Sequence, residues 1–297
     1  MSVNRKIFYE RKSEMKIVHL CLGAFFPDNY SYQENMLPKF HKKQGYDVEV
    51  IASLETFDND GKTCYYSEAK RYTNENDVLV TRLNYKSPDK FYKKLKRFSE
   101  LSQALEMAKP DILFIHNVQF LDMDKVVSYL KRNKKVKVFC DNHADFTNSA
   151  KGFVSRRILH GIIWKHCAKS IEPYTTKFYG VLPARVDFLK EVYGLPEEKC
   201  ELLVMGADDD RVSQASDPAV REAVRKRYKI NDDEILLVTG GKIDHNKTQT
   251  LTLMDAINKL DNPKIKFTVF GSVVPELKEK FNSLLSDNVI YSGWKKS

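Results

Sequence analysis

The chain has 297 residues, a formal net charge of +9, 42% hydrophobic residues and 30% charged residues. Because single hydrophobic cores stop growing at roughly 250–300 residues, this length predicts two domains, or one domain and part of another. No stretch approaches the roughly 20 apolar residues of a membrane-spanning helix. The five cysteines are scattered and lack a Cys-x-x-Cys, which argues against a disulfide framework or a zinc site and favours a reducing cytoplasm.

Short apolar runs alternate with helical patterns along most of the chain. Residues 1–14 form a polar extension that lacks the apolar centre of a secretory signal. The predicted strands cover residues 16–23, 46–53, 77–83, 111–117, 136–142, 201–206, 234–241, 265–272 and 288–293. The predicted helices cover residues 31–44, 88–108, 122–133, 154–169, 217–228 and 249–260. Several strands are apolar on successive residues, which is typical of parallel sheets, so we predict an α/β fold of two Rossmann-like, doubly wound domains.

A polar stretch near residues 207–230 separates two strand–helix series. We assign residues 15–210 to an N-terminal, acceptor-side domain and residues 211–297 to a nucleotide-sugar-binding domain. The second domain contains only three predicted strands, and a sheet of that size leaves apolar edges uncovered. We therefore expect the second domain to be incomplete.

The segment LLVTGGKIDHNKTQTL (236–251) is the most informative in the chain. Gly240 and Gly241 end a strand, Lys242 and Lys247 flank a polar loop, and a helix begins near Thr248. Glycines let a ligand approach the backbone closely, and lysines supply charge for phosphate. Ligands bind at the carboxyl ends of strands in α/β sheets, so this pattern favours a phosphate site.

Two other interpretations of this segment are open. Gly241-x4-Asn246-Lys247-Thr248 differs by one residue from the phosphate loop of nucleotide hydrolases, but the later strands do not end in an acidic metal ligand. The loop is alternatively a solvent-exposed connection that contains two lysines. No G-x-G-x-x-G occurs, which disfavours a nicotinamide-dependent oxidoreductase.

Five motifs, in order, resemble those of retaining GT-B glycosyltransferases of family 4. GGKIDHNKT resembles the Gly-Arg-apolar-Asp and Lys-Gly pattern of the nucleotide-sugar domain, with Lys242 in place of Arg and Thr248 in place of Gly. The upstream segments that resemble family motifs are KIVHLCLGAFFPDN, KPDILFIHN, VKVFCDNHADF and YGLPEEKCELLVMGADDD. The similarity spans about Lys16 to Trp294.

This resemblance implies a hexosyltransferase that moves a sugar from a nucleotide-sugar donor to a glycan or lipid-linked acceptor, as in cell-surface polysaccharide synthesis. It implies that Lys242 and Lys247, beside Gly240 and Gly241, bind the donor diphosphate. Fixed cations and backbone N–H groups can stabilise a departing diphosphate, so we expect no metal and no cofactor. Lysine in place of arginine keeps the charge but loses the bidentate fork.

The resemblance also implies that His143 is a catalytic residue that contacts the transferred sugar or the reacting oxygens. A histidine hydrogen-bonded at a strand end is the structural alternative. Asn117, Asp145 and Asp208 are candidates for the cleft or the acceptor side. A plain strand terminus also explains Asn117 and His116, and Asp145 lies one position later than the family pattern places its aspartate. Asp208–Asp210 cannot all face one ion, so a solvated turn is favoured there.

The sequence departs from the family in two places. The first loop, GAFFPDNYSYQEN, lacks the Gly-Gly of many members, so the resemblance does not support acceptor binding by this loop. The family holds the sugar and ribose of the donor with two glutamates separated by seven residues, which the resemblance places after residue 297, and no such pair occurs within the chain. A non-catalytic fragment or pseudoenzyme is therefore the first alternative function.

The net positive charge falls entirely within residues 1–200, with basic amphipathic patterns at 86–98 and 155–169. Such helices favour anionic lipid surfaces, although a solvated helix face explains each pattern equally well. We find no signal for nucleic-acid binding. We expect a cytoplasmic protein, with peripheral association at the inner membrane face as a further hypothesis and a basic membrane-binding adaptor as the second alternative function.

Overall fold

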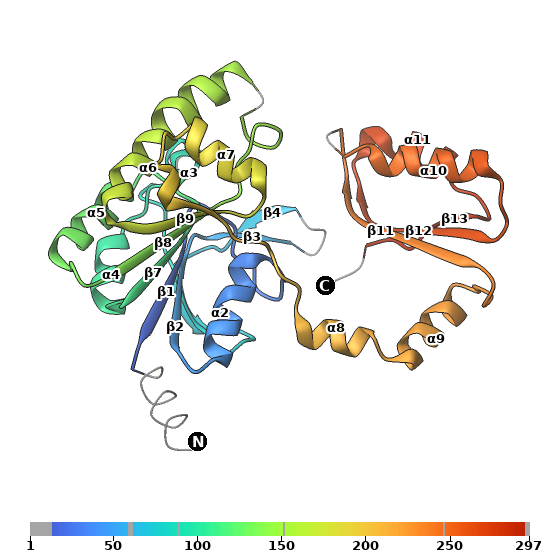
Figure 1. The fold of residues 1–297 in the computed structure, drawn as a ribbon, viewed down its shortest axis with the longest axis horizontal. Helices are drawn as coiled ribbons and strands as arrows, with labels where there is room; N and C mark the ends of the chain where they lie inside the picture. The colour runs from blue at the N-terminus through green and yellow to red at the C-terminus, as the bar shows by residue number, and fades with distance from the viewer. Residues whose placement is uncertain (1–13, 59–61, 88–89, 151, 246, 295–297) are drawn as a thin grey trace. The chain divides into compact units, whose positions relative to one another are not determined.

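The computed structural model describes residues 14–58, 62–87, 90–150, 152–245 and 247–294. Residues 1–13 of the expected polar extension and Asn246 of the loop motif lie outside the described residues. The chain forms two compact units, here called the N-terminal unit, which ends at Gly206, and the C-terminal unit, which begins at Ala207 (Figure 1).

The N-terminal unit is built on an eight-stranded sheet with the order β10-β9-β8-β7-β1-β2-β6-β5. Its strands are β1 (Lys16–Cys21), β2 (Asp47–Ala52), β5 (Lys70–Thr73), β6 (Leu79–Arg82), β7 (Ile112–His116), β8 (Lys137–Asn142), β9 (Thr175–Gly180) and β10 (Cys200–Leu202). All neighbours pair in parallel except β5, which is antiparallel to β6. A separate antiparallel pair is formed by β3 (Glu55–Phe57) and β4 (Thr63–Tyr65).

Helices cover both faces of this sheet (Figure 1). They are α2 (Gln33–Lys43), α3 (Lys90–Leu95), α4 (Leu101–Ala108), α5 (Met123–Arg132), the π-helix η1 (Ser155–Trp164), α6 (Lys165–Ile171), the 3-10 turn η2 (Glu172–Tyr174), α7 (Pro183–Glu191) and the 3-10 turn η3 (Glu197–Lys199). Alternate residues of a strand point to opposite faces. Val18 and Leu20 of β1 therefore join the core beneath α4, α5 and α6, whereas His19 and Cys21 face the side of α2.

The strand order of the N-terminal unit reverses between β1 and β7. From β1 the chain proceeds to β2 and β6 in one direction, and from β7 to β8, β9 and β10 in the other. Open α/β sheets bind ligands outside the carboxyl ends of the strands at such a switch point. The residues that follow β1, β7 and β8 thus occupy the favoured ligand position of this unit.

The C-terminal unit contains a three-stranded parallel sheet in the order β11-β12-β13. Its elements are α8 (Asp209–Ala215), α9 (Pro218–Arg227), β11 (Ile235–Ile243), α10 (Gln249–Leu260), β12 (Ile265–Val273), the 3-10 turn η4 (Pro275–Leu277), α11 (Lys278–Ser283) and β13 (Val289–Tyr291). Figure 1 shows α10 and α11 on the same face of the sheet. Met254 and Phe281 from these helices pack on Phe267 and Val289 to form its core.

The predicted parallel α/β architecture is confirmed, because every predicted strand forms. The prediction of one helix over residues 88–108 is wrong: α3 and α4 are separated by a segment in which Phe98 bridges to Tyr85. The prediction of a turn at Asp208 is also corrected, since this residue caps α8. Strands β3, β4, β5 and β9 and helices α7 and α8 were not predicted.

The described residues contain no helix long and apolar enough to cross a membrane. Across the same residues, no group of three or more His, Cys, Asp or Glu side chains is placed to hold a metal ion. All five cysteines are free thiols, and burial raises the pKa of the Cys167 thiol to about 12.

Arg82 is a buried cation that ties the loop after β1 to the edge of the sheet. Its side chain is fully buried, and its guanidinium donates to the carbonyl oxygens of Phe26 at 2.7 Å and Ser53 at 2.9 Å. Its Nε donates to the Tyr72 hydroxyl at 3.0 Å, and Asp28 Oδ2 lies 3.4 Å from Nη2. A buried charge is tolerated only when it is paired and hydrogen-bonded, as here.

We predict that Arg82→Met lowers the free energy of unfolding by about 3–5 kcal/mol, because it leaves buried carbonyl oxygens and Asp28 without their cation. Arg71→Met is the matched control, since Arg71 is half exposed and reaches Glu49 only at 3.6 Å, and it should cost less than about 1 kcal/mol. Urea denaturation followed by circular dichroism measures both changes. Equal losses for the two variants would contradict the prediction.

Candidate functional site

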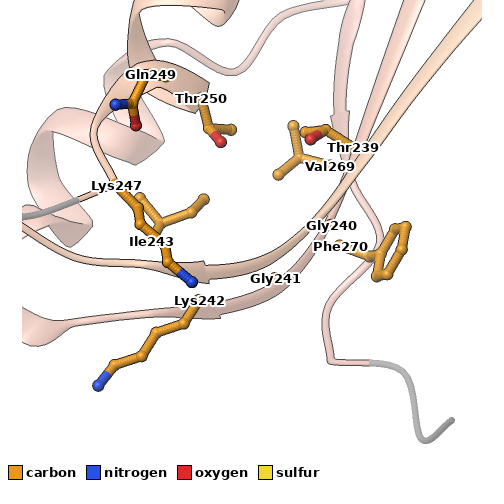
Figure 2. Close-up of a pocket in the computed structure, with 10 residues that line it drawn as sticks. All are labelled: Thr239, Gly240, Gly241, Lys242, Ile243, Lys247, Gln249, Thr250, Val269 and Phe270. Atoms are coloured by element: carbon orange, nitrogen blue, oxygen red, sulfur yellow. The ribbon is translucent and has the colours of Figure 1, made fainter. Parts of the chain in front are cut away.

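A small pocket lies where β11 meets the start of α10 in the C-terminal unit (Figure 2). It has a volume of about 190 Å³. Its lining residues, which include all four predicted diphosphate-binding residues, are Thr239, Gly240, Gly241, Lys242, Ile243, Lys247, Gln249, Thr250, Val269 and Phe270. The structure therefore brings the glycines and both lysines of the sequence motif around one pocket.

The N-terminus of α10 gives this pocket a positive potential. The first N–H groups of a helix have no partner within the helix, and the aligned peptide dipoles make this end electropositive. The preceding residue, Thr248, makes no side-chain cap, and Gln249 and Thr250 of the first turn line the pocket. Together with the exposed Lys247, this arrangement suits an anion such as phosphate.

The two lysines are placed differently. Figure 2 shows the Lys247 ammonium beside the β11 backbone, whereas the Lys242 side chain extends away from the other lining side chains. The Lys242 side chain is 61% exposed, and its Nζ lies 3.9 Å from Asp244 Oδ2. A long, solvated side chain on a weak ion pair can change rotamer at little cost. Lys247 faces the pocket as it stands, and Lys242 would have to turn to reach it.

The two glycines serve different purposes. A Cβ on Gly240 would lie 2.1 Å from the ring of Phe270, so glycine here makes room for an aromatic side chain. Gly241 has φ of +129°, a conformation that favours glycine, and no atom lies within 4 Å of its Cβ position. Only Gly241 thus leaves open space in which a ligand could approach the backbone.

The size of the pocket limits what it can hold. Sites for drug-sized molecules usually measure roughly 300–1,000 Å³, which exceeds the volume found here. A volume of this size is on the scale of a small polar group such as a phosphate. The pocket is therefore small compared with the usual site for a drug-sized ligand.

A second polar cluster lies at the carboxyl ends of β7 and β8 in the N-terminal unit. At its centre is Asp141, whose side chain is fully buried. Its Oδ2 lies 2.7 Å from His116 Nδ1 and accepts from Gln33 Nε2 at 3.2 Å, and its Oδ1 accepts from the Asn117 backbone N–H at 3.0 Å. We call this group the Asp141 cluster; its members are Gln33, Glu34, His116, Asn117, Asp141 and His143.

His143 lies at the exposed side of the Asp141 cluster. Its Nε2 is 3.7 Å from Asp141 Oδ1 and 3.6 Å from Glu34 Oε1. Burial disfavours its charged form, but the neighbouring carboxylates of Asp141 and Glu34 outweigh this effect and raise the pKa of His143. Burial alone would raise the pKa of the Asp141 carboxyl, but the contacts with His116 and His143 outweigh burial and lower this pKa. The contact between the two residues thus favours the protonated form of His143 and the ionised form of Asp141.

Three polar atoms of the Asp141 cluster are buried without a hydrogen-bond partner. They are Gln33 Oε1, Asn117 Oδ1 and His143 Nε2. Unpaired buried polar atoms are costly, so such atoms mark a place where a polar ligand or water belongs. Their position at the switch point of the sheet agrees with a site for a ligand rich in hydroxyl groups.

The remaining predicted site residues make structural contacts. Asn117 follows β7 in a left-handed conformation, with φ of 66°, and is 8% exposed. Asp145 accepts from Thr147 and Asn148 within its own turn and from Arg185 Nε at 3.2 Å. Asp208 accepts from the Asp210 N–H and caps α8 in the C-terminal unit. Asn117 alone of the three belongs to the Asp141 cluster.

Sequence reasoning singled out His143 and Asn117 but missed Asp141, Gln33 and Glu34. A usable signal was present for Asp141, because a carboxylate that directly follows the apolar run Val138–Cys140 of a buried strand needs a buried partner. No comparable signal exists for Gln33 and Glu34, which are polar residues in the first turn of an ordinary amphipathic helix.

Comparison with solved structures places the chain among proteins of one fold. A glycosyltransferase from Rickettsia africae aligns with a TM-score of 0.58 over 95% of this chain and 68% of its own, at 15% sequence identity. HepE from Anabaena, solved with UDP and glucose, aligns with a TM-score of 0.56 over 95% of this chain and 70% of its own, at 11% identity. A UDP-GlcNAc 2-epimerase from Neisseria meningitidis, bound to UDP-GlcNAc, aligns with a TM-score of 0.53 over 95% of this chain and 73% of its own, at 12% identity. No protein-family model and no curated protein matches the sequence.

At these identities the comparisons establish the fold. The expected GT-B-like arrangement of Rossmann-like sheets is confirmed, and the chain spans about 70% of the length of these neighbours. The neighbours include both glycosyltransferases and an epimerase, so the fold by itself does not select the reaction.

We predict that the N-terminal unit loses stability as the pH falls from about 6.5 toward 4. Burial, and then the nearby His116, lowers the pKa of His41 to about 4, and burial lowers the pKa of His160 to about 4. The unfolded chain, with a histidine pKa of about 6.5, therefore takes up protons that the folded state refuses. Stability is fully present above about pH 6.5 and is lost as the pH approaches 4.

Urea midpoints measured between pH 7 and pH 4 test this prediction. His41→Asn keeps a donor in place of Nδ1. This variant should lose about 1–2 kcal/mol less of its free energy of unfolding than the wild type between pH 7 and pH 4. His166→Asn changes an exposed ring in the same unit and serves as the control. An unchanged slope in His41→Asn would show that the prediction is wrong.

Proposed function

We propose that the protein is a nucleotide-sugar-dependent hexosyltransferase that uses a glycan or lipid-linked acceptor. The observation that carries the proposal is the pocket at the N-terminus of α10, where two glycines and two lysines of the family-4 motif meet. We assign donor binding to the C-terminal unit and acceptor binding to the N-terminal unit. Retention of configuration and family-4 membership rest on the resemblance in sequence.

The chemistry of the pocket suits a departing nucleoside diphosphate. Negative charge grows on the diphosphate as its bond to the sugar breaks. The α10 N–H groups and Lys247 are fixed close to that position, and Lys242 can add a second cation by changing rotamer. Charge that is in place before the reaction costs no reorganisation when the bond breaks, which is how such groups accelerate a reaction.

The Asp141 cluster supplies the second set of polar groups. We assign to His143, in its protonated form, a hydrogen bond to a hydroxyl of the transferred sugar or to a reacting oxygen. The unpartnered Asn117 Oδ1 and Gln33 Oε1 would accept from further hydroxyl groups. We assign no ligand contact to Asp145 or Asp208, because Asp145 stabilises its own turn and Asp208 caps α8.

The structural neighbours support nucleotide-sugar binding more broadly than they support transfer. HepE was solved with UDP and glucose, and the epimerase with UDP-GlcNAc. Both ligands share a uridine diphosphate. Transfer is favoured over epimerisation by the five ordered family motifs. A nucleotide-binding protein without transferase activity is the alternative.

We predict that Lys247→Ala weakens binding of UDP or GDP about tenfold and that Lys242→Ala has a smaller effect. Removing one charge-assisted contact to phosphate costs about 1.5–3 kcal/mol, and Lys247 is the lysine that faces the pocket. Isothermal titration calorimetry on the full chain measures both. Lys259→Ala, at the far end of α10, is the matched control.

If the variant lacking both Lys242 and Lys247 bound UDP and GDP as tightly as the wild type, the phosphate assignment would be refuted. A screen of nucleotide-sugars against the wild type then separates transfer from binding alone. Release of nucleoside diphosphate only in the presence of an acceptor glycan supports the transferase, whereas binding without release supports the non-catalytic alternative.

We further propose that η1 brings the protein to an anionic membrane surface on the cytoplasmic side. Phe153, Val154, Ile158 and Ile162 are all exposed, at 76%, 61%, 44% and 64%. Arg156 and Arg157 are exposed beside them. Exposed apolar side chains next to arginines are the pattern of helices that lie in the interface of anionic bilayers. A lipid-linked acceptor would be reached at such a surface.

The other basic segment, residues 86–98, is a weaker candidate. Lys96 Nζ donates to the Gly23 carbonyl at 3.0 Å and lies 3.7 Å from Glu55, and Arg97 Nε lies 3.7 Å from Asp122. These cations serve contacts within the unit and are not available to lipid. Residues 88–89 of this segment lie outside the described residues.

We predict that replacing Ile158 and Ile162 by glutamate together abolishes sedimentation with vesicles that contain anionic lipid. The change removes apolar contact and adds like charge at the proposed surface. Charge reversal at Lys93 and Lys94 is the control and should reduce sedimentation only weakly. Sedimentation that is unaffected by the change in η1 would remove the membrane proposal.

A further inference from the structure

Three histidines form a continuous hydrogen-bonded chain that ends on Asp141. His41 of α2 lies with Nδ1 3.0 Å from His19 Nε2, and His19 Nδ1 lies 2.9 Å from His116 Nε2. His116 Nδ1 in turn lies 2.7 Å from Asp141 Oδ2. His19 and His116 are completely buried, whereas His41 is only partly buried. The chain therefore runs from the outer part of the unit to the carboxylate beneath His143.

Asp141 fixes the direction of this chain. An ionised carboxylate only accepts hydrogen bonds, so His116 must carry its proton on Nδ1. A neutral imidazole has one donor and one acceptor, so His116 Nε2 accepts from His19 Nδ1–H, and His19 Nε2 accepts from His41 Nδ1–H. All three rings are thus Nδ1–H tautomers, and each donates toward Asp141.

We propose that His41, His19 and His116 form a directional proton relay that links Asp141, and through it His143, to solvent at His41. A solvent proton binds His41 Nε2, and the Nδ1 proton of each ring passes to the next acceptor in turn. The last proton passes from His116 Nδ1 to Asp141 Oδ2. One proton enters and one arrives, Asp141 becomes a neutral acid, and all three rings end as Nε2–H tautomers.

The surroundings of the chain suit a relay through neutral rings. Burial, and then the two neighbouring histidines, lowers the pKa of His19 well below its usual value, so the central ring favours its neutral form. The ring centroids of His19 and His116 are 5.2 Å apart with planes inclined by 20°, and those of His19 and His41 are 5.1 Å apart with planes inclined by 29°. The rings therefore meet edge to edge, with the bonded nitrogen atoms nearly in line. Buried polar rings are costly unless each is paired, and every step of this chain is paired.

Few other titratable groups face the chain and its end. Phe114 of β7 packs against His19, and Tyr46 packs against His41. Those that face Asp141 and His143 are Cys21 of β1, Glu34 of α2 and Arg185 of α7. Burial, and then the charge of Glu34, raises the pKa of the Cys21 thiol, so it stays neutral. Among the described residues, the carboxylate nearest to this inner end besides Asp141 is that of Glu34, whose Oε1 lies 3.6 Å from His143 Nε2.

Nitrogen-15 NMR of the imidazole rings in the full wild-type chain tests the relay directly. In neutral solution we expect Nδ1–H tautomers at His41, His19 and His116, although free histidine in water favours Nε2–H. An Nε2–H tautomer at any of the three rings would overturn the proposal, and this measurement needs no variant.

Asp141→Asn gives the sharper test, because its amide can donate to His116 Nδ1 and so imitates protonated Asp141. We expect the pyrrole-type and pyridine-type nitrogen signals to exchange places at all three rings, including His41, two histidines away from the substitution. His160, which pairs with the Tyr193 hydroxyl at 3.0 Å in the same unit, is the control ring and should not change. A tautomer change confined to His116 would refute the relay.

His19→Phe cuts the chain while keeping a stacked ring. In this background, changing Asp141 to Asn should no longer affect His41, and a persistent effect would refute the relay. The link to catalysis rests on the proposed function: in a wild type that transfers sugar, His19→Phe should shift the pH dependence of the rate, whereas His160→Gln should not. A wild type that transfers no sugar would contradict the proposed function alone, since the tautomers are measured without a substrate.

Discussion

The N-terminal unit is organised around the need to compensate one buried carboxylate. Asp141 lies at the end of β8 with no exposed surface, and an ion in that position is stable only if nearly all of its acceptor sites are filled. Its partners come from α2, from the end of β7 and from the backbone that follows it. These elements meet at the point where the strand order reverses. The same contacts that neutralise the charge therefore fix the geometry of the ligand position above it.

The two units present complementary kinds of polar chemistry. The C-terminal unit offers positive charge, from lysines and from the peptide dipoles of α10, around a pocket of about 190 Å³. The N-terminal unit offers hydrogen-bonding groups that suit hydroxyls, together with a histidine and a carboxylate. Each unit has its own hydrophobic core, built from one face of its sheet and the helices that cover it. The polar groups lie outside these cores, so packing alone does not account for them.

The sequence was sufficient to predict the elements whose pattern is local and strong. Parallel strands such as 111–117 are apolar throughout and bounded by polar residues, and the segment after β11 carries its glycines and lysines in one short run. Strand β9, TTKFYG, was missed because its residues alternate in burial and include a lysine. The Asp141 cluster could be predicted only in part, since His143 stands in a motif but Gln33 and Glu34 join it through the packing of α2. Pairing between distant segments leaves no trace in local composition.

Gly240 and Phe270 occupy adjacent strands in register, and the ring fills the volume that a side chain at residue 240 would need. The sizes of the side chains at these two positions are thus coupled in space. Among relatives of this chain, a residue larger than glycine at position 240 should accompany a small residue at position 270, and the aromatic ring should accompany glycine. Gly241 has no such partner, and its φ of +129° favours glycine through the backbone alone, so the two neighbouring glycines are required for different reasons.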